Sequence, residues 1–371
     1  HTYANCGTYT VTLIVTSTDG CAASITKQVE VYCLPVASFT VNNVCDGNDA
    51  SFVNTSQNGI AYSWNFGDGN TSTAQNPFHT YAAPGTYTVT LIVNNGPGCS
   101  DVFTSTVTIH PKPVADFNAP NACDGNLISF NNTSSILSGS IIGNAWNFGD
   151  GNSSTAQNPT HTYANSNIYN VTLIVVSDMG CTDTLTKPVT IYPNPVVSFN
   201  ASDVCEGNAI AFAGSSSIII GSSWNWNFGD GASGSGQNTS HNYAAPGAYS
   251  VTLVVTTANG CVDSVSKIVN VFQTPSASFA ADTTSGCAPL CVNFTNLSSI
   301  GDNSPLTYAW NFGNGNGSSN TNGSQCYQNT GTTPLSFTVS LTVTSDKGCT
   351  DTYSQNNLIT VFPVPIADFN M

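Results

Sequence analysis

The sequence predicts an all-β protein, built as a tandem array of antiparallel β-sandwiches that form an elongated rod. The main observation is a motif, Trp64-Asn65-Phe66-Gly67-Asp68-Gly69, which recurs at 146–151, at 226–231 and, more loosely, at 310–315. Between the copies lie short alternating segments bounded by turn residues, and no convincing helical pattern occurs. Such a pattern is typical of a sandwich of two sheets. One sequence unit, copied, therefore accounts for the whole chain.

Prolines mark where each unit begins. Pro35, Pro113, Pro195, Pro275 and Pro365 open similar segments at spacings of 78, 82, 80 and 90 residues. We therefore expect complete repeats at 35–112, 113–194, 195–274 and 275–364, called repeats I to IV below. Residues 1–34 are expected to be the C-terminal half of an earlier repeat, and 365–371 the first strand of a later one. The chain is then expected to be a segment of a longer polypeptide.

Repeat I illustrates the strands. Alternation of apolar and polar residues, interrupted by Gly, Pro, Asn and Asp, marks their limits. Strands are expected at 36–40, 50–54, 61–66, 79–81 and 87–93, with a last strand that runs to 109 after the turn at 95–98. In the strand 87–93, the side chains Tyr87, Val89, Leu91 and Val93 are expected to point inward.

Composition excludes several classes of function. Five Lys plus Arg against twenty Asp plus Glu leave a net charge of −15, so a surface for nucleic acid or anionic membrane is not expected. No apolar run approaches the ~20 residues of a membrane helix, so we expect no membrane insertion in this segment. The 13 Cys residues indicate an oxidising setting. We therefore expect a secreted protein, extracellular or on the cell surface.

The motifs carry a family resemblance. Trp-Asn-Phe-Gly-Asp-Gly, His-Thr-Tyr and Pro-Gly-Thr-Tyr-Thr-Val-Thr-Leu together resemble the PKD (polycystic kidney disease) domain, an immunoglobulin-like sandwich. The resemblance covers essentially the whole chain and implies tandem immunoglobulin-like, PKD-type domains. Repeat IV departs from the pattern, with Asn314 in place of the Asp and Gln325-Cys326-Tyr327 in place of His-Thr-Tyr.

The strand order A to G of such a domain bears on the cysteines. It puts the A–B and F–G loops at opposite poles, too far apart for a disulfide, whose Cα atoms lie within ~7 Å. Head-to-tail stacking would bring the A–B loop of one repeat beside the F–G loop of the next. The bridges then expected are Cys45–Cys181, Cys123–Cys261 and Cys205–Cys349. The alternative is a bridge within each repeat, such as Cys45–Cys99.

Two further bridges are expected inside single repeats. In the hairpin that turns at Asp19-Gly20, residues whose numbers sum to 39 should face each other, which pairs Cys6 with Cys33. Cys291 on strand B and Cys326 on strand E should be neighbours in one sheet. Cys21, Cys99 and Cys287 are left to pair with segments outside this chain.

Catalytic and metal-binding residues are the next question. His1, His79, His161 and His241 occupy one recurrent slot, and such recurrence favours a structural role. No Ser-His-acid set or Cys-His pair can be assembled, so we expect no enzyme and no catalytic residues. Asp68, Asp150 and Asp230 are candidate Ca²⁺ ligands, but one Asp per turn falls short of the six or more oxygens that Ca²⁺ takes. Hydrogen bonding of each Asp within its own turn is favoured, and no other cofactor is expected.

The four motif tryptophans could stack on sugars, but their alternation with Phe favours the core; Trp224 is ambiguous.

Apolar insertions between strands B and C are candidate contact residues. They are Ile136, Leu137, Ile141 and Ile142 in repeat II, and Ile218, Ile219 and Ile220 in repeat III. Packing at the junction with the preceding repeat is favoured over an adhesive patch. Ile14, Ile92, Ile174 and Val254 point outward on strand F, as lateral contacts or beneath a neighbouring loop.

These observations predict a non-enzymatic, extracellular structural or adhesive protein. It would be a rod of domains that serves as a surface stalk, an adhesin or a filament-forming subunit. Its partners would be neighbouring copies of itself, or other surface proteins or polysaccharides. The alternative is a carbohydrate- or protein-binding accessory region of a secreted hydrolase.

Overall fold

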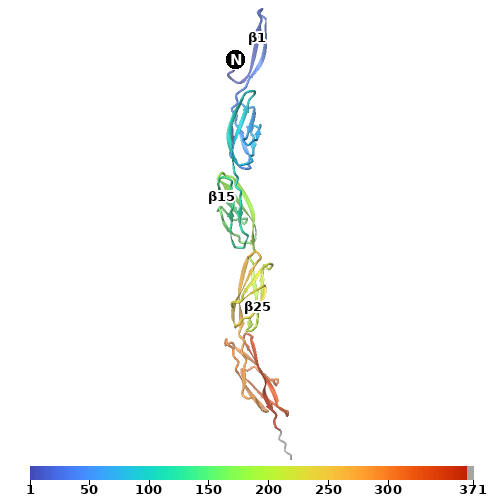
Figure 1. Ribbon diagram of the computed structural model, residues 1–371. Helices are drawn as coiled ribbons and strands as arrows, with labels where there is room; N and C mark the ends of the chain where they lie inside the picture. The colour runs from blue at the N-terminus through green and yellow to red at the C-terminus, as the bar shows by residue number, and fades with distance from the viewer. Residues whose placement is uncertain (366–371) are drawn as a thin grey trace, which may run out of the picture. The chain divides into compact units, whose positions relative to one another are not determined.

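The computed structural model describes residues 1–365, which form strands and turns and contain no helix (Figure 1). The chain divides into two compact units. One runs from His1 to Tyr192 and holds an N-terminal hairpin with repeats I and II. The other begins at Pro193 and holds repeats III and IV. The strand expected at 365–371 lies outside the described residues, apart from Pro365.

The N-terminal hairpin pairs β1 (Gly7–Thr16) with β2 (Ala22–Val31). Its register joins Gly7 to Val31 and Leu13 to Ile25, so facing residues sum to 38 and the expected sum of 39 is wrong by one. The cause is the turn, in which Ser17 N donates to Cys21 O at 2.9 Å and closes a loop centred on Asp19. Cys6 and Cys33 lie beyond the paired strands and form a disulfide with Cα atoms 5.0 Å apart.

Repeat I is a sandwich of a five-stranded and a three-stranded sheet. Its strands A, B, C, E, F and G are β3, β5, β6, β8, β9 and β10, and the same letters are used for repeats II to IV. The larger sheet has the order β4 (Val44–Cys45), β10 (Ser100–His110), β9 (Gly85–Asn94), β6 (Ala61–Asn65), β7 (Thr71–Ser72). The smaller sheet has the order β3 (Phe39–Val41), β5 (Ala50–Asn54), β8 (Phe78–His79).

The start of repeat I differs from the sequence-based expectation. The first strand was expected at 36–40, yet β3 begins at Phe39, and Val36 makes only an isolated bridge with Gln57. The reason is that Ser38 N donates to Ser56 Oγ at 3.0 Å, although Ser38 O still accepts from Thr55 N in the ladder. Ala37 N donates to the Asp101 carboxylate at 2.8 Å. Between the strands expected at 36–40 and 50–54, Val44 and Cys45 form β4, which pairs in parallel with β10. The larger sheet is therefore mixed.

Repeats II and III keep this topology. In repeat II the larger sheet is β12 (Ala122–Cys123), β19 (Thr182–Tyr192), β18 (Asn167–Ser177), β15 (Ile141–Asn147), β16 (Ser153–Ser154), and the smaller one splits into β11 (Phe117–Asn118) with β14 (Asn131–Asn132), and β13 (Leu127–Ser129) with β17 (Thr160–Thr162). In repeat III the sheets are β21 (Val204–Cys205), β27 (Val262–Phe272), β26 (Gly247–Thr256), β23 (Ser223–Asn227), β24 (Ser233–Ser235), and β20 (Val197–Asn200), β22 (Ile210–Ser216), β25 (Asn238–His241).

Repeat IV has the same two sheets. They are β29 (Ser285–Cys287), β35 (Thr350–Phe362), β34 (Leu335–Ser345), β31 (Leu306–Asn311), β32 (Gly317–Ser318), and β28 (Phe279–Ala281), β30 (Leu290–Asn296), β33 (Gly323–Tyr327). Cys291 and Cys326 face each other on β30 and β33 and form a disulfide.

Each complete repeat has its own hydrophobic core. The four motif tryptophans are at most 3% exposed, and Trp224 is also buried. They are therefore core residues and not sugar platforms, and burial of each such side chain contributes roughly 1.5–3 kcal/mol to folding. Because Trp64 and Phe66 point inward, the Gly67-Asp68-Gly69 turn that follows is held at the end of the sandwich.

Candidate functional site

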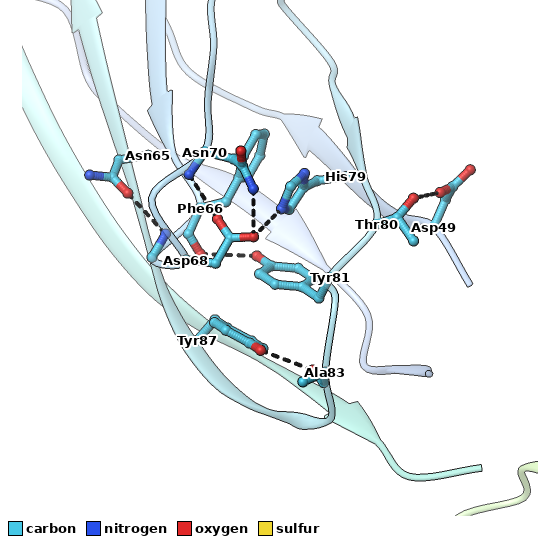
Figure 2. A network of polar contacts seen from close by, with 11 residues as sticks. Asp49, Asn65, Phe66, Asp68, Asn70, His79, Thr80, Tyr81, Ala83 and Tyr87 are labelled. Atoms are coloured by element: carbon cyan, nitrogen blue, oxygen red, sulfur yellow. Dashed lines mark hydrogen bonds and ion pairs between the residues drawn. The ribbon is translucent and has the colours of Figure 1, made fainter. Parts of the chain in front are cut away.

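The Gly-Asp-Gly turn meets the His-Thr-Tyr segment at one end of repeat I (Figure 2). The strand expected at 79–81 is instead β8 (Phe78–His79), so Thr80 and Tyr81 lie just beyond it. The Asp68 carboxylate accepts from the Asn70 backbone N–H and from Asn70 Nδ2, each at 3.0 Å, and lies 2.7 Å from His79 Nε2. Both side chains are largely covered, with 14% of Asp68 and 13% of His79 exposed. The turn requires Gly67, because φ is +85° there and a Cβ would lie 2.4 Å from Thr88 O.

Aromatic rings surround the same histidine. The His79 ring stacks on Phe66 with centroids 4.2 Å apart and meets Tyr81 edge to face. The Tyr81 hydroxyl donates to Phe66 O at 3.1 Å, and Tyr87 stacks on Tyr81 and donates to Ala83 O (Figure 2). These contacts connect strands C, E and F where the sheets end.

The network controls ionisation of the acid. Burial alone would raise the pKa of Asp68, but hydrogen bonds from Asn70 N and from His79 outweigh burial and lower the pKa to about 2. In repeat III, the hydrogen bond from His241 is the main cause that lowers the pKa of Asp230. Burial raises the pKa of Tyr243 to about 12, so this hydroxyl stays a donor to Phe228 O. The carboxylates are therefore held ionised.

This arrangement favours a structural role for the Asp68–His79 pair over metal binding or catalysis. N–H donors face both carboxylate oxygens of Asp68, and these donors compete with a cation for the same oxygens. Among the described residues, no group of three or more His, Cys, Asp or Glu is placed to hold a metal ion. The hydroxyls of Tyr81 and Tyr87 each donate to a backbone carbonyl. Neither is therefore positioned as a nucleophile activated by the Asp-His pair.

Repeats II and III contain the same pair. His161 Nε2 lies 2.6 Å from Asp150, and His241 Nε2 lies 2.6 Å from Asp230. Sequence reasoning treated these Asp and His residues separately and missed that they meet. A signal was present, because repeat IV replaces both partners together, with Asn314 and Gln325.

A second recurrent aspartate was also missed. Asp101, Asp183, Asp263 and Asp351 each follow an F–G loop cysteine by two residues. Each accepts a backbone N–H from the start of strand A, for example Ala115 N to Asp183 at 2.8 Å. This fixed spacing after cysteine is the signal that could have found them.

Disulfides join consecutive repeats. Cys45, in the A–B loop of repeat I, is bonded to Cys181, in the F–G loop of repeat II, with Cα atoms 5.7 Å apart. Cys205 of repeat III is bonded to Cys349 of repeat IV in the same way, at 5.6 Å. Cys123 and Cys261 are also disulfide-bonded, and their pairing with each other stays a prediction. Cys21, Cys99 and Cys287 are free thiols.

The linkers between repeats are held by side chains on both sides. Lys112 reaches Asp183 at 3.5 Å across the I–II junction. At the start of repeat I, Asn95 Nδ2 donates to Cys33 O at 2.9 Å, and Gly96 lies so close to Tyr32 that a Cβ would come within 2.6 Å of its ring. The F–G turn of a following repeat thus packs on the linker that precedes it.

The apolar residues inserted between strands B and C lie in different environments. Ile136 lines a cavity of about 120 Å³ at the I–II junction, together with Pro111 of the linker. Ile141 packs against the core of repeat II, whereas Leu137 and Ile142 are exposed. In repeat III, Ile218 is partly buried, and Ile219 and Ile220 are exposed.

The four repeats match a known domain family. A sequence profile of the PKD domain matches residues 34–111, 110–191, 192–273 and 272–361. The chain belongs to the PKD domain family. Its PKD domains occupy nearly all of the described residues, and these residues include no helix long and apolar enough to cross a membrane.

Several relatives contain similar PKD domains. The pre-pro-metalloprotease PrtV of Vibrio cholerae is 28% identical over 180 residues, which are 48% of this chain and 18% of that protein. Collagenase ColA of Bacillus cereus is 48% identical over 60 residues, or 16% of this chain and 6% of that protein. The crystal structure of the PKD1 domain of PrtV is 36% identical and matches 22% of this chain and 98% of its own, with a TM-score of 0.21. The chain thus spans less than a fifth of these curated relatives.

Proposed function

We propose that this chain is a non-catalytic, extracellular spacer: a rod of PKD domains that acts as a stalk, an adhesin or a filament subunit. The observation that carries the proposal is the disulfide between consecutive domains. A bridge such as Cys45–Cys181 removes most of the freedom of the Pro111-Lys112-Pro113 linker, because it adds a second covalent connection at the same junction. Extracellular location is proposed because ten cysteines are oxidised.

Small-angle X-ray scattering of the full 371-residue chain tests the spacer. The double variant Cys45→Ser/Cys181→Ser is expected to broaden the distribution of end-to-end distances, because only the short linker then joins repeats I and II. The control Cys291→Ser/Cys326→Ser removes a bridge inside repeat IV and should leave that distribution unchanged. A compact wild-type particle, or equal distributions for all three proteins, would contradict the spacer.

A binding role is the second candidate, favoured by the collagenases among the relatives. The chain would then hold a larger enzyme on its substrate as an accessory region. Co-sedimentation with fibrillar collagen tests this role, with bovine serum albumin as the control protein. Retention no higher than that of albumin at ~100 μM, where even weak accessory binding should register, would remove this candidate for collagen.

A further inference from the structure

The outward face of strands F and G consists mainly of threonine, serine and aliphatic residues. We call it the FG face. In repeat I, strand pairing sets Thr86, Thr88, Thr90 and Ile92 of β9 opposite Thr108, Thr106, Thr104 and Val102 of β10. The alternate residues Val89, Leu91, Val93 and Val107 are fully buried. Because side chains alternate along a strand, the threonine rows face away from the core.

No charged residue occupies the FG face in any complete repeat, although the chain carries twenty Asp plus Glu. The strand-G aspartates and Lys187 and Lys267 lie at inward-facing positions, opposite core residues such as Val171 and Val251. The outward positions in repeats II, III and IV hold Asn170, Thr172, Ile174, Thr184, Thr186 and Pro188; Ser250, Thr252, Val254, Ser264, Ser266 and Ile268; and Ser340, Thr342, Thr344, Thr350, Thr352 and Ser354.

The hydroxyl groups on the FG face bond to one another. Cross-strand Oγ distances are 3.1 Å for Thr86 and Thr108, 2.8 Å for Thr172 and Thr186, and 2.8 Å for Thr342 and Thr352. Pairing of this kind uses hydrogen-bonding capacity within the sheet and leaves the methyl groups to solvent. Val102 is 55% exposed and Ile268 68% exposed on the same face. The FG face is therefore more apolar than its threonine content suggests.

We propose that the FG face is a lateral interface with a second copy of this chain. Two molecules of net charge −15 repel each other, and they can approach without burying a carboxylate only where both surfaces are uncharged. The four cross-strand pairs of β9 and β10 named above include no aromatic ring on which a sugar could stack. Two sheet faces, in contrast, pack well about 10 Å apart.

The area of the face sets the expected strength. Two strands ~4.8 Å apart and about 30 Å long give roughly 300 Å² for one repeat, from ordinary strand dimensions. A stable interface takes about 800 Å² from each partner. One repeat therefore associates weakly, and useful affinity requires several repeats in contact at once. The requirement for several repeats in contact rests on the stiff junctions of the proposed function. The observation that the FG face is uncharged is independent of that proposal.

Sedimentation equilibrium of the full chain tests the interface. We expect self-association that strengthens as salt rises, because the Debye length falls from about 30 Å at 0.01 M to about 8 Å at 0.15 M and screens the repulsion. The variant Ile92→Glu/Ile174→Glu/Val254→Glu/Thr342→Glu places charge at one strand-F position in all four repeats. It is expected to lower the association constant at least tenfold.

A matched control adds the same charge elsewhere. Val53→Glu/Leu127→Glu/Ala213→Glu/Thr295→Glu lies on the exposed side of the smaller sheets and should lower association much less. A milder set, Ile92→Thr/Ile174→Thr/Val254→Thr, removes apolar area without charge and should weaken association by a smaller factor even if the Glu variant folds poorly. A chain that stays monomeric at every salt concentration, or equal loss in the control, would overturn the interface. Loss of association only in Cys45→Ser/Cys181→Ser would instead assign the effect to the junction.

Discussion

At the scale of single residues, Asp68 and its counterparts make folding sensitive to acid. The folded pKa of Asp68 is about 2, below its ordinary value of 3.8. Between these values the unfolded chain takes up a proton that the folded chain does not, so the contribution is present above pH 3.8 and lost as pH falls toward 2. The hydrogen bonds from Asn70 and His79 cause this lowered pKa, so their weakening on protonation is the same effect and not an additional one.

We therefore expect Asp68→Asn to destabilise the turn of repeat I by about 1–2 kcal/mol near neutral pH and to reduce its acid sensitivity. Asn keeps the turn bond, since Asn314 already accepts from Asn316 N in repeat IV. Hydrogen exchange followed by mass spectrometry reports each repeat separately. The turn around Asn314 in repeat IV serves as the internal control, and among the four equivalent turns it should show the weakest acid dependence in the wild-type chain. Equal acid dependence of the Asp68 and Asn314 turns would contradict this role.

At the residue scale, the buried side chains could be predicted from the sequence, but the Asp–His contact could not. The inward Trp64 and Phe66 could be predicted because alternation decides which face of a strand is buried. The Asp68–His79 pair could not be predicted from period alone, because it joins a turn after strand C of the larger sheet to strand E of the smaller sheet, and their approach depends on how the two sheets pack. The joint replacement of both residues in repeat IV was the available evidence, and it required a comparison between repeats.

At the scale of elements, strand G covers an aromatic ring of strand A in two alternative ways. Phe39 meets Phe103 edge to face at 5.3 Å, and Phe279 meets Tyr353 at 5.4 Å. In repeats II and III, Lys187 and Lys267 instead lie over Phe117 and Phe199, at 5.3 and 5.1 Å. The lysine stands two residues further along strand G than the aromatic residue. Each repeat therefore covers its strand-A ring with either the aromatic residue or the lysine.

This exchange predicts coupling between Phe103 and Ser105. Phe103→Leu alone should destabilise repeat I by about 1 kcal/mol, because the ring pair is lost. Adding Ser105→Lys, which copies repeat II, should restore part of that loss through a cation–π contact. Hydrogen exchange in β3 measures both. Phe103→Leu/Ser105→Ala is the control, and equal exchange in the two double variants would refute the coupling.

Element boundaries were predicted less well than element types. The strand at 50–54 coincides with β5, because its apolar alternation and flanking turn residues are local. The parallel pairing of β4 with β10 depends on residues 65 positions apart, and no local pattern reports it. The one-residue error in the hairpin register came from the turn, whose hydrogen bonds decide the loop length.

At the scale of the whole molecule, the cysteines allow a simple accounting. Ten of the 13 are oxidised and three are free. Thiol titration with a chromogenic disulfide should therefore find three thiols in the denatured, unreduced chain. In the folded chain the exposed Cys21 and Cys287 should react faster than the partly covered Cys99. Five thiols would mean that two of these ten cysteines are reduced. Non-reducing peptide mapping would show which two, and whether Cys123 is bonded to Cys261.

The repeat period and the proline positions were enough to predict the number of complete domains, because each copy must build its own core. The PKD profile likewise matches four consecutive segments of the chain. The relative orientation of successive domains is a different matter, since it depends on junction side chains such as Lys112 and Asn95 that vary from one copy to the next.

The bridges between neighbouring domains also bear on damage to the backbone. A protease that cuts once anywhere between Cys45 and Cys181 leaves both fragments tied through that bond, and the same holds between Cys205 and Cys349. If Cys123 is bonded to Cys261, these protected spans overlap, and a single cleavage anywhere from 46 to 348 leaves one covalent molecule. A nicked chain could thus still bear a load until its disulfides were reduced.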